Sequence, residues 1–174
     1  DGHAHCFGAD CDYQYQPAKD EKMKTPPPLP SSEKQQSKLI KFVSPRALKL
    51  RGITEETAKF FEYGYAEYWD QVVQVATYQD QLGRPIAQHV RFQDKKFVWI
   101  KDGDISTLQL WAQKLWRQYH GKTSNAFAVI TEGEIDCMSV SQVQGNRFPV
   151  VSLPSGAQSA SKYIAANIKW LSQF

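Results

Sequence analysis

From residue 125 onward the sequence alternates between strand and helix patterns, and this alternation leaves few possible folds. AFAVI (residues 126–130) and FPVVSL (148–153) are continuous apolar runs, which favour strands buried on both faces. Helix-like segments follow them, EIDCMSVSQVQG (134–145) and AQSASKYIAANIKWLSQF (157–174). A β-α-β-α unit of this kind builds a parallel sheet, and functional groups gather at the C-terminal ends of its strands.

Three acidic residues, Glu132, Glu134 and Asp136, follow the first of these strands. Acidic side chains at one strand end repel one another unless a cation lies among them, and that cation is often a divalent metal ion. Gly133 permits the tight turn into the helix. Glu132 therefore fits a general base or a metal ligand, with Asp136 completing the charge. The alternative is that these acids only complement the dipole of the helix in its first turn.

Residues 38–124 carry a different pattern. Ser44 and Pro45 fit the start of a short helix that stops at Gly52, and Thr54 fits the N-cap of a second helix that stops at Gly64. These signals predict two short helices joined by a tight connection.

From residue 72 onward, apolar residues alternate with polar ones at the two-residue period of β-strands. VVQVATY (72–78) and PIAQHVRF (85–92) alternate and are rich in β-branched residues, and DQLGR joins them, which predicts a hairpin. KKFVWI (95–100) predicts a third strand, and LQLWAQKLWRQY (108–119) has apolar residues near helical spacing. Cys137, on the helix after the acidic residues, is expected in the core.

Residues 38–101 hold eleven Lys and Arg against seven Asp and Glu, an excess of four, which suits a surface that follows a phosphate backbone. Four aromatic residues of this region either stack on bases or fill the core: Trp69, Phe92, Phe97 and Trp99. The net charge of the whole chain, +3, is too small by itself to indicate a polyanionic partner. No run of 18 apolar residues is present, so we expect no membrane partner.

The N-terminal part divides into two stretches. DGHAHCFGADC opens the chain, and residues 17–37 are polar and rich in proline, which predicts an extended linker. Three cysteines, two of them close together, do not make a secreted disulfide scaffold, so a reducing, intracellular setting is expected.

Several motifs occur in the order and near the spacing of one family: GITEETAKFFEYGY, VVQVATYQDQLGRPIAQHVRFQDKKF, VITEGEIDCMSV, PVVSLPSGAQSASK and AAN-x-x-x-L-x-Q-F. They resemble the primase half of the bifunctional primase–helicases of short-tailed bacteriophages, relatives of the mitochondrial Twinkle helicase. The resemblance covers residues 39–174. Within it, VITEGEID followed by VVSLPSGAQSA is similar to the opening of a Toprim domain, the module shared by primases and topoisomerases.

The resemblance implies an α+β fold, in which a small helix and β-hairpin subdomain precedes the first β-α-β-α half of a Toprim domain, a Rossmann-like parallel domain. It divides the chain into a remnant of a zinc-ribbon module (1–16), a proline-rich linker (17–37), a basic N-terminal primase subdomain (38–124) and a partial Toprim domain (125–174). The chain begins within a Cys/His cluster and ends on a helix-like segment. We therefore expect it to be a fragment of a longer protein.

The resemblance also implies the site. Glu132 matches the catalytic acid–base position of the family, and we expect Asp136 to support it in catalysis. Glu132 would hold Mg²⁺ (or Mn²⁺) together with a D-x-D motif that we expect after Phe174. Two lysines of the family contact the incoming nucleotide, and their positions correspond to His89 and Lys95 here. We expect further nucleotide or DNA contacts at Arg91, Lys96, Ser155 and Gly156. The family has a lysine where this chain has His89, and a mostly neutral histidine is a weaker phosphate contact. From the residues alone, Lys95 and Lys96 also suit a solvated strand edge.

The N-terminal cluster resembles the second half of a zinc ribbon, which would bind Zn²⁺ in the complete module. Cys6 matches a ligand position. Cys11 comes two residues later than the family spacing, so it is either the fourth ligand, through a longer loop, or not a ligand. We expect no complete zinc site within this chain, because zinc takes four ligands in tetrahedral geometry.

Taken together, the resemblance implies a DNA primase that makes RNA primers on a single-stranded DNA template from ribonucleoside triphosphates. It implies a fused or associated replicative helicase, a DNA polymerase partner and a place in the cytoplasm of the infected bacterial host. We expect the chain alone to be inactive, since the D-x-D strand is not in it. Two alternatives stay open: another Toprim enzyme, such as a nuclease or topoisomerase, and a non-catalytic module that binds single-stranded DNA in a Twinkle-like helicase.

Overall fold

The computed structural model describes residues 4–5, 14–15, 37–117 and 127–174, in two units, 1–36 and 37–174. In the first unit, β1 (Ala4–His5) pairs antiparallel with β2 (Gln14–Tyr15). Cys6, Cys11 and almost all of the predicted linker lie outside the described residues. The zinc-ribbon and linker assignments therefore stay predictions.

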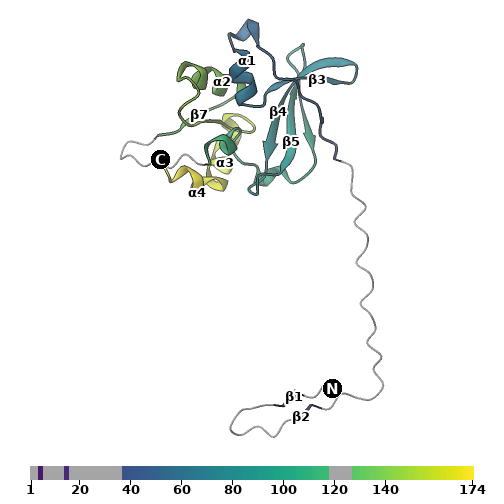
Figure 1. The fold of residues 1–174 in the computed structure, drawn as a ribbon, viewed down its shortest axis with the longest axis vertical. Helices are drawn as coiled ribbons and strands as arrows, with labels where there is room; N and C mark the ends of the chain where they lie inside the picture. The colour runs from purple at the N-terminus through teal and green to yellow at the C-terminus, as the bar shows by residue number, and fades with distance from the viewer. Residues whose placement is uncertain (1–3, 6–13, 16–36, 118–126) are drawn as a thin grey trace. The chain divides into compact units, whose positions relative to one another are not determined.

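An antiparallel sheet forms one half of the second unit (Figure 1). Its four strands follow one another in sequence and in space: β3 (Gly64–Tyr68), β4 (Gln71–Gln79), β5 (Pro85–Arg91) and β6 (Phe97–Lys101). The hairpin predicted from alternating residues is confirmed as β4 and β5, with β6 as its third strand. β3 was not predicted, because its first residue, Gly64, was interpreted only as the stop of the preceding helix.

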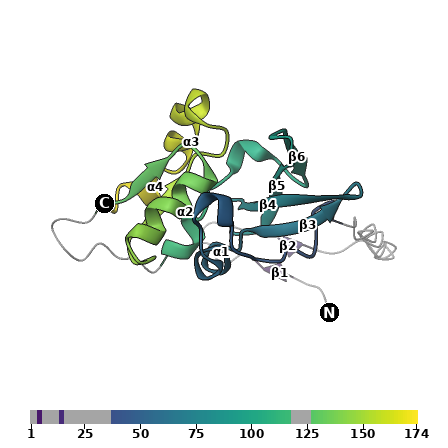
Figure 2. The ribbon, with the colours of Figure 1, turned by 90° about the horizontal axis from the view of Figure 1, so that it is seen from above.

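The parallel unit forms the other half. β7 (Val129–Thr131) pairs in parallel with β8 (Val150–Ser152), and α2 (Glu134–Val143) connects them, as the alternating pattern predicted. In Figure 1, α2 lies above β7, whereas α3 (Ala160–Ala166) and α4 (Ile168–Leu171) lie below it. The antiparallel sheet lies to the right of this unit in Figures 1 and 2. None of the described helices is long and apolar enough to cross a membrane.

Both faces of the antiparallel sheet are covered. Ala76, Tyr78 and Ala87 face the helices and belong to the larger core, which also contains Met138 and Val151. The opposite face carries a second core of Val73, Val75, Val90 and Ile100, and residues 39–43 pack over it. The buried side chain of Gln88 holds this covering segment, because its amide accepts from Ile40 N (2.7 Å) and donates to Ile40 O (3.0 Å).

A segment around Trp111 joins the two halves. Trp111 makes two backbone hydrogen bonds with Ser152, which adds an antiparallel bridge to the edge of β8. The Trp111 ring stacks on Phe61, with centroids 5.3 Å apart, and the buried Trp116 donates from Nε1 to Val150 O (3.0 Å). The predicted helix over residues 108–119 is therefore wrong for its first half. The chain is extended there, and within residues 108–117, the described part of this stretch, only η3 (Gln113–Trp116) forms a 3-10 turn, after Ala112 at a φ of 67°.

Two further helix predictions need correction. Residues 45–51 form no α-helix, because the backbone of Ser44 pairs with Tyr65 of β3, and only η1 (Lys49–Arg51) forms a turn before Gly52. The second helix begins as predicted at its N-cap Thr54, but α1 (Glu55–Phe60) ends before Gly64, which lies in β3.

The long C-terminal helix is interrupted. It forms η4 (Ala157–Ser159), α3 and α4, with the break at Asn167. The Asn167 side chain is buried and donates to Tyr163 O (2.9 Å) and to Leu108 O (3.1 Å), which ties the break to the segment before Trp111.

We expect Gly64→Ala to lower the free energy of unfolding by about 2 kcal/mol, because a methyl group there overpacks a rigid contact. A Cβ at Gly64 would lie 2.4 Å from the backbone oxygen of Ser44. Gly103→Ala is the control, since its Cβ would meet only the side chain of Ile86, at 3.2 Å. Urea unfolding measures both, and equal losses would contradict the steric explanation.

Candidate nucleotide site

The two parallel strands end at one place, and their loops carry the first part of the site. Glu132 follows β7 and is exposed, and its Oε1 lies 3.4 Å from the backbone N of Ala157 in the loop after β8. Gly156, in the same loop, has a φ of 68°, and a Cβ there would lie 3.2 Å from Glu132 Oε1. Glycine suits this position because it tolerates the positive φ and because it has no Cβ to approach the Glu132 carboxylate. The structure thus brings Glu132 and Gly156 together, with Ser155 exposed beside them.

Asp136 lies in the first turn of α2 and is exposed. It borders a small cleft of about 170 Å³ whose walls come from three elements. Arg91 and Phe97 line it from the antiparallel sheet, Arg51 from the turn before α1, and Gly133 from the start of α2. The cleft therefore places a predicted acid, Asp136, opposite a predicted cation, Arg91.

The acidic residues offer too few ligands for a metal site of their own. Carboxylate oxygens such as those of Glu132 and Asp136 are the ligands that Mg²⁺ prefers. Among residues 37–117 and 127–174, however, no three His, Cys, Asp or Glu side chains converge on one point. The described residues alone do not complete a magnesium site.

Glu134 does not join Glu132 and Asp136, contrary to the expectation that all three acids face one patch. Its side chain is only 12% exposed and points to the antiparallel sheet. Oε1 accepts from Tyr78 Oη (2.6 Å) on β4 and lies 2.6 Å from His89 Nδ1 on β5. One carboxylate oxygen therefore connects α2 to two neighbouring strands.

These contacts keep Glu134 ionised. Burial raises the pKa of its carboxyl, but the hydrogen bond and charge of His89, followed by the hydrogen bond of Tyr78, outweigh burial, so the pKa is lowered. Because an ionised carboxylate only accepts hydrogen bonds, Nδ1 of His89 must carry the proton that faces it. Burial, and then the Glu134 charge, hold the pKa of Tyr78 well above its usual value.

The ring of His89 is enclosed as well. It stacks between Phe97 and Trp99 of β6, with centroid distances of 4.8 and 4.6 Å, and its side chain is 18% exposed. The predicted nucleotide contact at this position is untested. The structure gives the imidazole another partner, Glu134, and leaves it little exposed surface.

A groove of about 590 Å³ lies beside the cleft and is lined by four cations. These are Lys49, Arg51, Arg91 and Lys95, around a floor that includes Tyr65 and Gln74. None of the four forms an ion pair with another described residue, and no acidic residue lines this groove. Arg51 and Arg91 line both the groove and the cleft, so a cationic surface extends to Asp136.

The turn that carries Lys49 and Arg51 is fixed to α2. The Gln142 amide accepts from Thr54 N (2.8 Å) and donates to Gly52 O (2.8 Å), which holds the backbone on either side of Ile53. Sequence reasoning missed both cations, because it placed residues 45–51 in a helix. The sequence motif K-x-R-G (residues 49–52) does not by itself show that this turn lies beside Arg91 in the folded chain.

The remaining predicted contacts lie at the turn between β5 and β6. Lys95, at a φ of 66°, lines the groove. Lys96 is 80% exposed and pairs with Asp94 (2.8 Å), and it is not among the residues that line the groove or the cleft. The structure therefore distinguishes the two neighbouring lysines.

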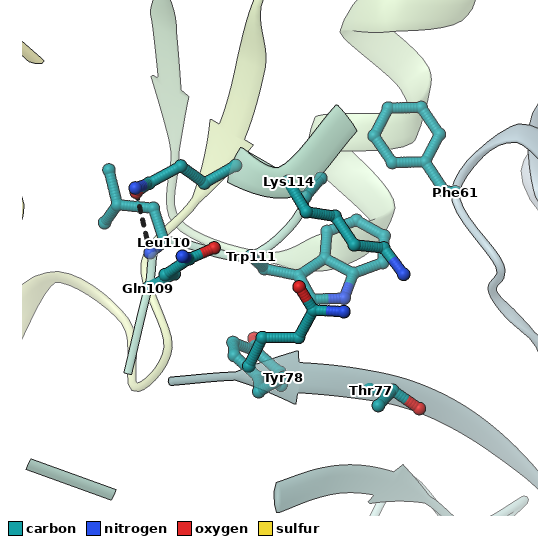
Figure 3. Close-up of a pocket in the computed structure, with 10 residues that line it drawn as sticks. Phe61, Thr77, Tyr78, Gln109, Leu110, Trp111 and Lys114 are labelled. Carbon is teal, nitrogen blue, oxygen red and sulfur yellow. Dashed lines mark hydrogen bonds between the residues drawn. The ribbon is translucent and has the colours of Figure 1, made fainter. Parts of the chain in front are cut away.

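The internal space beside Trp111 is not a substrate site. Figure 3 shows Trp111 between Tyr78 of β4 and Lys114, with Phe61 nearby. The cavity that they line with Gln109 has a volume of about 10 Å³, which is room for about one water molecule.

Comparisons with known proteins agree on one family. Residues 45–100 match the family model described as "Bacteriophage T7 DNA helicase/primase, N-terminal a+b fold". The chain is 38% identical over 127 residues to the DNA helicase/primase of Enterobacteria phage T3, a match that covers 73% of this chain and 21% of that protein. The chain thus spans about a fifth of the length of this curated relative.

Two solved structures share the fold. The crystal structure of the primase fragment of the bacteriophage T7 primase-helicase protein matches with a TM-score of 0.63 and 37% identity, over 75% of this chain and 51% of that one. A structure of the bacteriophage T7 lagging-strand DNA polymerase interacting with primase domains bound to an RNA/DNA hybrid and dTTP matches with a TM-score of 0.62 and 37% identity, over 75% and 55%. Both support the α+β fold.

We expect His89→Phe to lower the free energy of unfolding at pH 7 by about 3 kcal/mol, because it removes one of the two side chains that hydrogen-bond the buried Glu134 carboxylate and leaves Tyr78 as the other. The aromatic ring keeps the stack with Phe97 and Trp99. His89→Gln is the control, since its amide still donates and should cost less. Urea unfolding of the two variants is the measurement.

A double-mutant cycle with Glu134→Gln makes the test specific. Once Glu134 is neutral, His89→Phe should cost much less than it does in the unmodified chain. Additive losses would show that the two side chains do not act together.

Proposed function

The chain belongs to the family of bacteriophage DNA helicase/primases, and we propose that its second unit is the nucleotide-binding part of a DNA primase. The proposed reaction is the synthesis of short RNA primers on single-stranded DNA during phage DNA replication, in the cytoplasm of the infected host. The fold and the family support the assignment of this unit to the primase part of such a protein. The ribonucleotide substrates and the primer-synthesis reaction are what we propose in addition.

One observation carries the proposal: a groove lined by four cations leads to an acidic corner. Lys49, Arg51, Arg91 and Lys95 surround the groove without carboxylate partners among the described residues, and Arg51 and Arg91 continue to Asp136. Cations placed in this way suit the charged oxygens of a triphosphate or a nucleic-acid backbone. Phosphoryl transfer depends mainly on such positioning and charge neutralisation.

The acidic corner supplies a proton acceptor. In the proposed reaction the 3′-hydroxyl of the growing RNA attacks the α-phosphorus of a ribonucleoside triphosphate, the proton passes to Glu132, and pyrophosphate leaves. The Glu132 carboxylate is exposed at the end of β7 beside the glycine loop, where a substrate can approach it. Asp136 contributes negative charge at the same corner. Glu132 would hold Mg²⁺ or Mn²⁺ together with further ligands. The N-terminal cysteines would hold Zn²⁺ in the complete module.

The relatives suggest the partners. The name of the T3 relative combines helicase and primase, and we propose a fused or associated helicase for this chain as well. The similar T7 structure contains a polymerase that interacts with primase domains bound to an RNA/DNA hybrid. A DNA polymerase that receives the primer is the corresponding proposal here.

We expect Lys49→Ala, Arg51→Ala and Arg91→Ala each to weaken triphosphate binding about tenfold, as expected for a lost charged hydrogen bond. Anisotropy of a fluorescently labelled ribonucleoside triphosphate measures the affinity. Lys59→Ala is the control, because Lys59 lies on α1 and pairs with Glu55 (2.6 Å). Equal affinities for the groove variants and the control would reject the groove as the triphosphate site.

We expect Glu132→Gln to reduce primer synthesis at least about a hundredfold, because the amide cannot accept the proton. Triphosphate binding should change little, since the groove cations are intact. Primer synthesis is measured on single-stranded DNA with the native protein that carries this chain. Binding of template without any synthesis by the unmodified protein would instead favour the non-catalytic DNA-binding module.

A further inference from the structure

The turn between β3 and β4 presents an exposed tryptophan. Tyr68 pairs with Gln71, so Trp69 and Asp70 alone form the two-residue loop. Trp69 is 69% exposed. It stacks on Tyr68 with ring centroids 4.6 Å apart and an interplanar angle of 22°, so the partly buried tyrosine supports the indole.

The backbone of this turn does not suit a tryptophan. Trp69 has a φ of 49° and Asp70 a φ of 57°, positive at both central residues as in a type I′ turn, where Asn-Gly is preferred. A bulky residue at positive φ is uncommon. Because the indole is mostly exposed, burial does little to offset the local strain. A strained, exposed residue of this kind points to a role outside the fold itself.

The tryptophan is linked to the cationic groove through aromatic contacts. Tyr68 lies beside Phe92, with centroids 6.3 Å apart, and Phe92 lines the groove together with Arg91 and Lys95. The β3–β4 and β5–β6 turns lie at the same end of the antiparallel sheet, since β4 and β5 are neighbouring antiparallel strands. Trp69, Tyr68 and Phe92 therefore form an aromatic strip at this end of the sheet. Tyr68 and Phe92 pack against the second core, and the strip reaches the groove at Phe92.

The charges beside the strip indicate what it would bind. Glu67 and Asp70 are exposed next to Trp69, and Asp94 pairs with Lys96 at the neighbouring turn. Phosphates are therefore disfavoured at the tip and favoured in the groove, where four cations have no carboxylate partner among the described residues. A ligand with planar uncharged groups on one side and phosphates on the other fits this division.

We propose that the aromatic strip is a base-stacking platform for a single-stranded nucleic acid whose backbone lies in the groove. Bases stack on aromatic side chains without regard to sequence, and only an unpaired strand presents their faces. The proposal rests on the proposed function, because it extends the same groove from the incoming triphosphate to the template strand.

The test separates binding from folding. Trp69→Asn combined with Asp70→Gly installs the preferred type I′ turn, so its melting temperature should equal or exceed that of the unmodified chain. Its affinity for fluorescein-labelled oligo-dT should nevertheless fall about tenfold, the loss expected for one stacked base. Trp69→Phe keeps an aromatic face and should stay within about threefold. Anisotropy at low salt measures each affinity.

The control is Leu82→Ala, which removes another exposed apolar side chain, 74% exposed, from the β4–β5 loop at the opposite end of the sheet. It should leave oligo-dT binding unchanged. The platform proposal would be contradicted if the Asn-Gly variant bound oligo-dT as tightly as the unmodified chain. It would also be contradicted if Leu82→Ala lost as much affinity as the Asn-Gly variant. The affinity for the labelled ribonucleoside triphosphate is measured on the same variants. This affinity should be unaltered in the Trp69 variants, and it tests the groove independently of the aromatic strip.

Discussion

The carboxylate of Glu134 is the interaction on which the arrangement of the site depends. It reaches from the first turn of α2 to Tyr78 and His89 on the antiparallel sheet, at 2.6 Å in both cases. Glu132 and Asp136 lie two positions before and after it, so the contact that anchors Glu134 also fixes the junction between β7 and α2 on which both exposed acids lie. A buried ionised group is costly unless it is paired, and here its partners come from the other half of the unit.

Two side-chain amides hold the other parts of this arrangement. Gln142 binds the backbone around Ile53, which places the Lys49–Arg51 turn against α2. Gln88 binds the backbone of Ile40, which keeps residues 39–43 over the second core. In each case one amide both accepts from and donates to a single stretch of backbone, so an irregular segment gains a defined position without belonging to a sheet or helix.

The sequence predicted the elements whose pattern is local. Alternation was sufficient for the β4–β5 hairpin, and continuous apolar runs were sufficient for the parallel pair, which in turn located Glu132 beside the glycine loop. Sequence reasoning failed where a distant contact decides the conformation. Ser44 pairs with β3 instead of starting a helix, Trp111 pairs with β8, and the last helix breaks at Asn167, which bonds to Leu108. The partner of Glu134 could not be predicted either, because it depends on which sheet α2 packs against.

The cover over the second core has a consequence for how the chain tolerates cleavage. Lys38 and Lys41 lie at either end of the part of this cover that Gln88 holds, and both are exposed. Cleavage by trypsin after Lys41 would separate Ile40, whose backbone is bonded to Gln88, from the rest of the unit, and would uncover part of the face that carries Val73, Val75 and Val90. The uncovered face would be a flat row of β-branched side chains, which is the kind of surface that self-associates. A shortened chain that begins after this segment would therefore lose solubility before it lost the cationic groove, which lies on the opposite face of the same sheet.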